Sequence, residues 1–224
     1  LLISKQESPV YDVWRIGLMK QTETIAAIAT GLSDSGIGMI RISGDDAIAV
    51  GNRVFRSKNG CHNLYDYGSH TIHYGYVVDG EKTLDEVMIS VMKAPNSYTR
   101  EDTVEINCHG GILITMKILE TVLKSGARPA EPGEFTKRAF LNGRIDLTEA
   151  EAVMDLIQSR NEYALKASMN QLKGSVSNPI RRIREEILHE IAFIESALDD
   201  PEHISTDAYP EGLVLKVEDW TKKC

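Results

Sequence analysis

The sequence predicts an α+β domain followed by an all-α domain. Strand patterns interleave with helix patterns as far as about Lys124, strand signals stop beyond Pro132, and apolar residues then recur at helical spacing. A chain of 224 residues has room for one large domain or two small ones. We expect an extension or leader over residues 1–18, a mixed-sheet α+β domain over residues 19–136 and a long-helix domain over residues 137–224.

The α+β domain contains five strand patterns and two helix patterns. Residues 45–55 open with aspartates and carry apolar residues at helical spacing, and a second helix over residues 110–126 closes at Gly126. The third and fourth strands are separated by an Asp-Gly turn, which predicts a hairpin. The expected strands are residues 24–29, 38–43, 70–78, 84–92 and 103–108.

The second domain begins with a helix whose start is marked by Thr148 and Glu151, a pair with capping-box spacing. Between Leu165 and Leu198 apolar residues recur at a mean spacing of about 3.67, which predicts one long, nearly straight helix. Pro179 should kink this helix. We expect a loop over residues 199–212, where two prolines bracket an acidic segment.

The apolar stripe of this long helix needs a partner. Residues 137–160 and 210–224 of the same chain, a second chain, or sequence outside this chain could each cover it. An uncovered stripe drives association or local opening, so we expect residues 187–224 to be the least protected part of the protein.

Composition narrows the function classes. The net charge of −8 argues against a protein that coats nucleic acid through its overall electrostatic field, because binding to phosphates depends on Lys and Arg. A local basic run could bind RNA, although a solvent-exposed helix face explains it better. The run consists of Lys173, Arg181, Arg182 and Arg184. Three scattered cysteines do not make a disulfide framework and fit a reducing, cytoplasmic compartment. No apolar stretch is long enough to span a membrane.

Nucleotide and metal sites find little support. The phosphate-binding pattern GxxxxGK[ST] does not occur in the sequence. Gly110-Gly111, between a strand and a helix, could hold an anion at the helix N-terminus or could serve only close packing. Cysteines and histidines lack the spacing of a zinc site, so we expect neither a metal nor a catalytic residue in this chain.

Two charged residues interrupt apolar strands. Arg41 stands between Ile40 and Ile42, and Glu105 stands between Val104 and Ile106, so each faces away from its apolar neighbours. A solvated sheet face would explain both charges. They would equally suit a pocket for a ligand with an amide-like heterocycle at one end and an acid at the other, because a carboxylate accepts paired N–H groups and an arginine clamps an acid.

Four segments resemble one known family. TIAAIAT, GIGMIRISG, APNSYTREDTVEINCHGG and EPGEFTKRAFLNGRIDLTEAEAVMDLI are similar to the N-terminal half of the bacterial tRNA modification GTPases, the MnmE (TrmE) family. The similarity runs from about Thr22 to Asp200. It implies a folate-binding, dimerising domain similar to that of aminomethyltransferases, followed by a helical domain into which a GTPase domain is inserted.

The resemblance also implies a function. The family, with its FAD-dependent partner MnmG, adds aminomethyl or carboxymethylaminomethyl groups to C5 of the wobble uridine in tRNA. Its 5-formyltetrahydrofolate contacts fall here on Arg41, Glu105 and Arg144. GTP, magnesium and potassium would bind only in the GTPase domain, whose motifs are missing, so this chain alone should not hydrolyse GTP.

Two features depart from the family pattern. The first loop, residues 30–36, keeps few of the usual glycines and prolines, and the sequence stops near the point where the GTPase domain would begin. The alternatives to a folate-binding, homodimeric part of a cytoplasmic tRNA modification GTPase are a stand-alone folate-dependent one-carbon transferase and a helical interaction module without a ligand.

Overall fold

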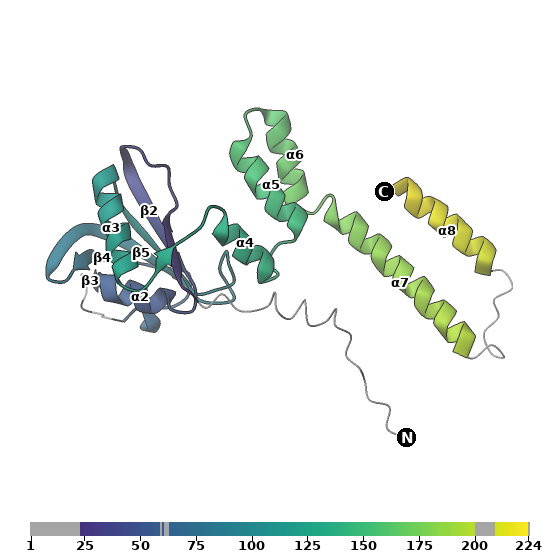
Figure 1. Cartoon of the computed structure of the whole chain (residues 1–224), viewed down its shortest axis with the longest axis horizontal. Coiled ribbons are helices and arrows are strands. Elements are labelled where there is room, and N and C mark those ends of the chain that lie inside the picture. Colours follow the sequence, from purple (N-terminus) through teal and green to yellow (C-terminus); the bar gives the residue numbers. More distant parts are fainter. Residues whose placement is uncertain (1–22, 59, 61–62, 200–208, 224) are drawn as a thin grey trace, which may run out of the picture. The chain divides into compact units, whose positions relative to one another are not determined.

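The computed structural model describes residues 23–58, 60, 63–199 and 209–223. The expected extension over residues 1–18 lies outside this range. The described chain divides into two compact units, the first ending at Arg144 and the second beginning at Ile145. The first unit is α+β and the second is all-α, as the sequence predicts (Figure 1).

The first unit is built on one seven-stranded sheet in the order β3-β4-β5-β6-β2-β1-β7. All neighbouring strands are antiparallel except β1 and β7. The five predicted strands are confirmed, and β3 and β7 are additional short edge strands. The strands are β1 (Ile25–Ile28), β2 (Ser35–Ser43), β3 (Phe55–Ser57), β4 (Thr71–Asp79), β5 (Lys82–Met92), β6 (Thr103–Gly110) and β7 (Arg128–Pro129).

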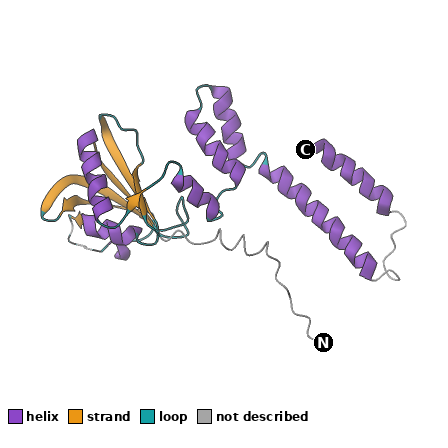
Figure 2. Ribbon diagram, in the orientation of Figure 1, coloured by secondary structure: helices purple, strands orange, loops and turns teal. Residues whose placement is uncertain are grey.

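Two helices, α2 (Ala47–Val54) and α3 (Ile112–Lys124), pack on one face of this sheet (Figure 2). The core forms there because alternate strand residues point to the helices. Ile40, Ile106 and Ile89 are fully buried against Ile48 and Ile118 of the helices. Burying such side chains contributes about 1.5–3 kcal/mol each. The opposite face carries exposed and half-buried residues, including Arg41 and Glu105.

The first unit extends past the expected boundary at residue 136. It includes a further helix, α4 (Glu134–Leu141), which ion pairs attach to the rest of the unit. Arg138 of α4 is buried and donates to both oxygens of Glu101 at 3.1 Å and to Glu134 Oε1 at 3.0 Å. A third contact joins Arg138 Nη2 to the backbone oxygen of Glu23, before β1. The helix and the turn that follows it therefore belong to the α+β unit.

The second unit starts with two helices that lie side by side, α5 (Leu147–Gln158) and α6 (Glu162–Leu172). The predicted capping box is displaced by two residues. Asp146 is the N-cap of α5 and pairs with Glu149, while the Thr148 hydroxyl donates to Asp146. The sequence offers both pairs, and the aspartate takes the cap because its carboxylate accepts the N–H of Glu149.

The predicted single long helix is two helices, α6 and α7 (Ser177–Asp199). The break falls at Gly174, which has a positive φ of 81° that favours glycine. Pro179 does not kink α7, because it lies in the first turn, where its missing N–H has no partner to lose.

Helix α8 (Tyr209–Lys223) begins inside the segment expected to be loop. The rest of that segment, residues 200–208, lies outside the described residues. Helix α8 packs on α7, where Trp220 is buried and donates to Glu186 at 2.6 Å, and Lys216 pairs with the buried Glu190. Much of the apolar stripe stays exposed, with Leu198 at 75% and Ile191 at 45%.

Three other expectations concern surfaces. In the described part of the chain, no helix combines the length and apolarity needed to cross a bilayer. The arginines of the basic run on α7 are exposed, which fits a solvated helix face. Gly110 packs so closely on β2 that a Cβ would lie 2.5 Å from the Ser35 carbonyl oxygen, so close packing accounts for the glycine there.

Candidate functional site

The open face of the sheet brings Arg41 and Glu105 into direct contact. The register of β2 and β6 places the two residues opposite each other. Arg41 Nε donates to Glu105 Oε1 at 2.8 Å, and Arg41 Nη2 lies 2.7 Å from the same oxygen. Among the described residues, Glu105 Oε2 has no hydrogen-bond partner. The pair therefore retains one carboxylate oxygen that can accept N–H groups from a ligand.

Two aromatic rings flank the Arg41 guanidinium. Its Cζ lies 5.7 Å from the ring centroid of Tyr98, in the β5–β6 loop, and 5.7 Å from that of Phe135, in the first turn of α4. Tyr98 is fixed to α4 by a hydrogen bond of 3.0 Å between its hydroxyl and that of Thr136. Aromatic faces attract a guanidinium and also suit flat ligand rings, so this arrangement both holds Arg41 and offers an apolar wall.

Arg144 reaches the same aromatic ring from the turn after α4. Its Cζ lies 4.8 Å from the Tyr98 centroid, and its Nη1 donates to the Tyr98 carbonyl at 2.9 Å. Gly143, with φ of 69°, makes the turn possible. Arg41 and Arg144 thus both lie against the Tyr98 ring, and Glu105, the third residue that the sequence and the family resemblance single out, joins them through its ion pair with Arg41.

A buried ionic network supports these side chains. Arg138 links Glu101 and Glu134, and Arg128 makes a bidentate pair with Glu134 at 2.6 and 2.9 Å. Arg128 is the main cause that lowers the pKa of Glu134 to about 2. Glu134 precedes Phe135, so the network positions this ring beside Arg41.

Sequence reasoning missed the buried roles of Arg138 and Glu101. The available signal was the i, i+4 spacing of Glu134 and Arg138 beside Phe135, but the partner Glu101 lies on a distant loop. A long-range buried pair of this kind leaves no periodic pattern in the sequence.

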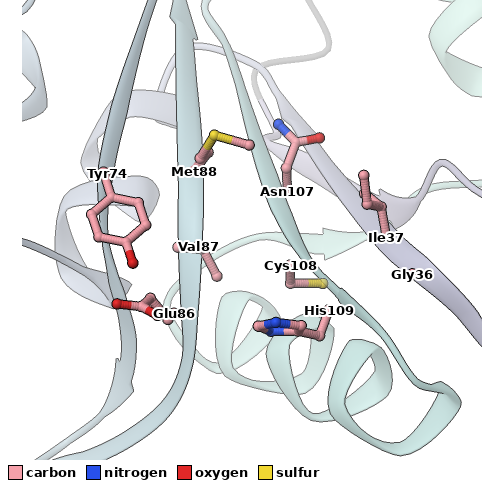
Figure 3. Close-up of a pocket in the computed structure, with 9 residues that line it drawn as sticks. All are labelled: Gly36, Ile37, Tyr74, Glu86, Val87, Met88, Asn107, Cys108 and His109. Atoms are coloured by element: carbon pink, nitrogen blue, oxygen red, sulfur yellow. The ribbon is translucent and has the colours of Figure 1, made fainter.

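A hollow of about 310 Å³ lies on the same open face, further along the strands (Figure 3). Its side chains come from four neighbouring strands. Tyr74 is on β4, Met88 and Glu86 are on β5, Asn107 and His109 are on β6, and β2 supplies Ile37. Polar groups thus interrupt an otherwise apolar surface, a composition typical of small-molecule sites.

His109 has a fixed ring orientation beside this hollow. Its Nδ1 lies 2.7 Å from Asp85 Oδ1, and its backbone N–H donates to Asp85 Oδ2 at 2.8 Å. A neutral imidazole that donates through Nδ1 accepts through Nε2. Cys108, its neighbour, is buried, and burial raises the pKa of the thiol, so this cysteine is unsuited to act as a nucleophile.

In the described ranges, no three histidine, cysteine, aspartate or glutamate residues are grouped so that they could hold a metal ion. The open face instead combines a carboxylate, two guanidinium groups and aromatic walls. These groups can bind a flat, hydrogen-bonding heterocycle that carries an acid.

Comparison with known proteins identifies the family. The profile described as "GTP-binding protein TrmE N-terminus" matches residues 24–144, and the "MnmE helical domain" matches residues 147–223. The "tRNA modification GTPase MnmE" of Lachnoclostridium phytofermentans is 59% identical over 193 residues, which are 86% of this chain and 42% of the relative. The proteins of the same name from Streptococcus thermophilus and Enterococcus faecalis are 51% and 48% identical, each over 89% of this chain and 43% of the relative.

The matched regions coincide with the two units of the structure and with the strands and helices that build the open-face site. The chain spans a little over two-fifths of the length of these relatives. Sequence and fold together show that the chain belongs to the MnmE (TrmE) family of tRNA modification GTPases, of which it represents the N-terminal and helical regions.

Proposed function

We propose that the first unit binds a reduced folate, 5-formyltetrahydrofolate, through Arg41, Glu105 and Arg144. The observation that carries the proposal is that Arg41 and Arg144 share the Tyr98 ring while Arg41 holds Glu105 in an ion pair. Glu105 offers Oε2 to paired N–H groups of a pterin, and Arg144 offers a guanidinium to the glutamate end. Tyr98 and Phe135 supply aromatic walls for the rings between these ends.

We further propose that the whole protein modifies tRNA as its relatives' name states. In this role it would act in the cytoplasm with the FAD-dependent partner MnmG, and it would add aminomethyl or carboxymethylaminomethyl groups to C5 of the wobble uridine. The folate would serve as the one-carbon source. GTP, with magnesium and potassium, would bind in a GTPase domain outside this chain, since the phosphate-binding pattern is missing here.

The first unit is also proposed to form the homodimer, through residues 24–125. Support comes from the open face, where Ile72 on β4 is 66% exposed and Ile37 on β2 is 61% exposed. Exposed large apolar side chains on one sheet face are typical of an interface or a ligand site.

Calorimetric titration of the 224-residue chain tests the binding proposal. The chain should bind 5-formyltetrahydrofolate and give no heat with GTP and magnesium. Binding of GTP without binding of folate would contradict the proposal. A folate-binding chain that also transfers the one-carbon unit unaided would favour the alternative of a stand-alone transferase.

A further inference from the structure

The basic run of α7 belongs to a longer basic segment, residues 160–184, which joins α6 to α7 (Figure 1). This segment contains six basic side chains and one acid, Glu162, in a chain whose net charge is −8. No acidic residue occurs between Glu162 and Glu185. All six basic residues are exposed, and they are Arg160, Lys166, Lys173, Arg181, Arg182 and Arg184.

The arginines of the basic segment differ from those of the first unit in their pairing. Each of the seven described arginines of the first unit donates a hydrogen bond to a backbone or carboxylate oxygen. Within the described ranges, the four arginines of the basic segment donate none and form no ion pair. A helix face that only meets solvent usually alternates acids with bases, which then pair. Unpaired guanidinium groups without an intervening acid are instead typical of a surface that attracts an anion.

The arginines of α7 lie off the face that packs on α8. Glu190, which accepts hydrogen bonds from α8, and the buried Ile183 are seven residues apart and mark that face. Since a helix turns by about 100° per residue, Arg181, Arg182 and Arg184 all project away from it. The first turn of α7 contains no acid, so the positive end of the helix dipole adds to the field of these cations.

The two lysines lie on the outer face of α6. Gln171 donates to the Thr148 carbonyl of α5 at 3.0 Å, and Ser168, three residues earlier on the same face, is buried. Lys166 precedes Ser168 by two residues, and Lys173 follows Gln171 by two. Two residues rotate a helix by more than half a turn, so both lysines lie opposite the α5 contact.

An aromatic ring accompanies the lysines. Tyr163 is 89% exposed in the first turn of α6, three residues before Lys166, so the two side chains are neighbours on the helix surface. In the part of the chain that the structure describes, this ring has no hydrogen bond or ring contact. Bases of single-stranded nucleic acid stack on exposed rings while cations bind the phosphates. An acidic protein surface would use the cations but offers no base to the ring.

We propose that the basic segment is an RNA-binding surface, which holds phosphates with its six cations and stacks an unpaired base on Tyr163. The assignment rests on the proposed action on tRNA and adds the part of the chain that touches the RNA. It is separate from the folate site, which belongs to the first unit. The negative net charge does not oppose it, because phosphates respond to the local field of the surface.

Fluorescence anisotropy of a labelled RNA stem-loop tests the surface on the whole 224-residue chain. The wild type should bind at low salt and lose affinity steeply as salt rises, because phosphate contacts release counterions. Changing both Lys166→Gln and Lys173→Gln should weaken binding by about tenfold at low salt. The slope of the logarithm of the binding constant against the logarithm of the salt concentration should fall by about two. The matched control, Lys82→Gln with Lys117→Gln, removes the same charge from exposed residues of the first unit and should leave binding unchanged.

Tyr163→Ala tests the stacked base. It should weaken binding of the stem-loop by about tenfold and leave a blunt RNA duplex unaffected, because a duplex has no unstacked base to offer. Tyr65→Ala removes a ring that is 47% exposed in the first unit and should bind both RNAs as the wild type does. Equal loss of stem-loop and duplex in Tyr163→Ala would contradict base stacking.

A footprint on the wild-type chain does not depend on any variant folding. Bound stem-loop should protect Lys166 and Lys173 from acetylation and leave Lys82 and Lys117 reactive. Equal reactivity of all four lysines with and without bound RNA would overturn the surface.

The remaining outcomes separate this surface from the proposed function. A wild-type chain that binds no RNA at low salt, or a Lys166→Gln and Lys173→Gln variant that binds it normally, overturns the surface and leaves the folate titration unaffected. If polyglutamate binds as tightly as RNA and is lost in the same variant, the segment serves an acidic protein and the RNA assignment is wrong. If the chain passes these tests but the whole protein does not modify tRNA, the proposed function fails and the RNA-binding surface stands.

Discussion

Arg138 donates to both carboxylate oxygens of Glu101, at 3.1 Å each, although the two residues lie on α4 and on the β5–β6 loop. The guanidinium is buried, so this pair holds the aromatic side of the site against the sheet. The positions of Tyr98 and Phe135, the two rings that flank Arg41, therefore depend on this buried charge pair.

We predict that Arg138→Met destabilises the first unit by about 3–5 kcal/mol, because it leaves the Glu101 carboxylate without its buried partner. Urea denaturation followed by far-ultraviolet circular dichroism would measure the change in the free energy of unfolding. The control is Lys117→Met on the exposed side of α3, which should change stability by less than about 0.5 kcal/mol. Equal stability of the two variants would contradict a structural role for the network.

The free energy of unfolding should fall in acid, because the Glu134 carboxylate becomes protonated. Its folded pKa is lowered to about 2 from an ordinary 4.5, chiefly by Arg128, and its side chain is 1% exposed. A lowered folded pKa gives stability that is complete above the unfolded pKa and lost as pH falls towards 2. The shift corresponds to roughly 3 kcal/mol.

Glu134→Gln should remove this dependence. Unfolding free energies measured from pH 6 to pH 2 should fall less steeply for the variant than for the wild type, while Glu81→Gln, in an exposed turn, should follow the wild type. Parallel curves for Glu134→Gln and the wild type would show that the carboxylate is not held by Arg128 in solution.

The proposed homodimer predicts that a charge on the open face disrupts it. Ile72→Glu places a carboxylate on a side chain that is 66% exposed on β4, and light scattering should then report a monomer. Leu113→Glu changes a similarly exposed residue on α3, at 73%, and should leave the dimer intact. A dimer that survives the first change but not the second would place the interface on the helical face instead.

Hydrogen exchange should distinguish the core of the first unit from the C-terminal half of α7. Amides of residues 103–123 should exchange slowly, because β6 and α3 enclose the core, and those from Ile187 to Asp199 should exchange quickly. The reason is the apolar stripe of α7, where Ile187 and Ile194 stay 39% and 37% exposed despite α8. Uniform protection through Leu198 would mean that the stripe is covered in solution.

Much of the fold follows from local patterns. The alternation of buried and charged residues in β2 and β6 predicts both strands and the shared face of Arg41 and Glu105, which the register confirms. Gly126 closes α3 as expected, directly after the C-cap residue Ser125 and with a positive φ of 114°. These features need only the period of a strand and the conformational freedom of a glycine.

Other features depend on a choice between alternative helix boundaries or caps that the sequence pattern does not resolve. A continuous apolar period hides the break at Gly174, because the period continues in α7 after the turn. Asp146 and Thr148 both suit a helix cap, and only the three-dimensional geometry selects the aspartate. Tyr98 carries no periodic signal for a site, since it lies in the β5–β6 loop and meets Arg144 only through the fold.

The central claim is that Glu105 anchors a folate, and one titration tests it most directly. Calorimetry of the whole chain with 5-formyltetrahydrofolate should show binding that Glu105→Gln weakens by about 1.5–3 kcal/mol, the scale of hydrogen bonds to a charged group. Glu81→Gln provides the same change on an exposed turn and should bind as the wild type does. Folate binding that is equally strong in Glu105→Gln and the wild type would contradict the account.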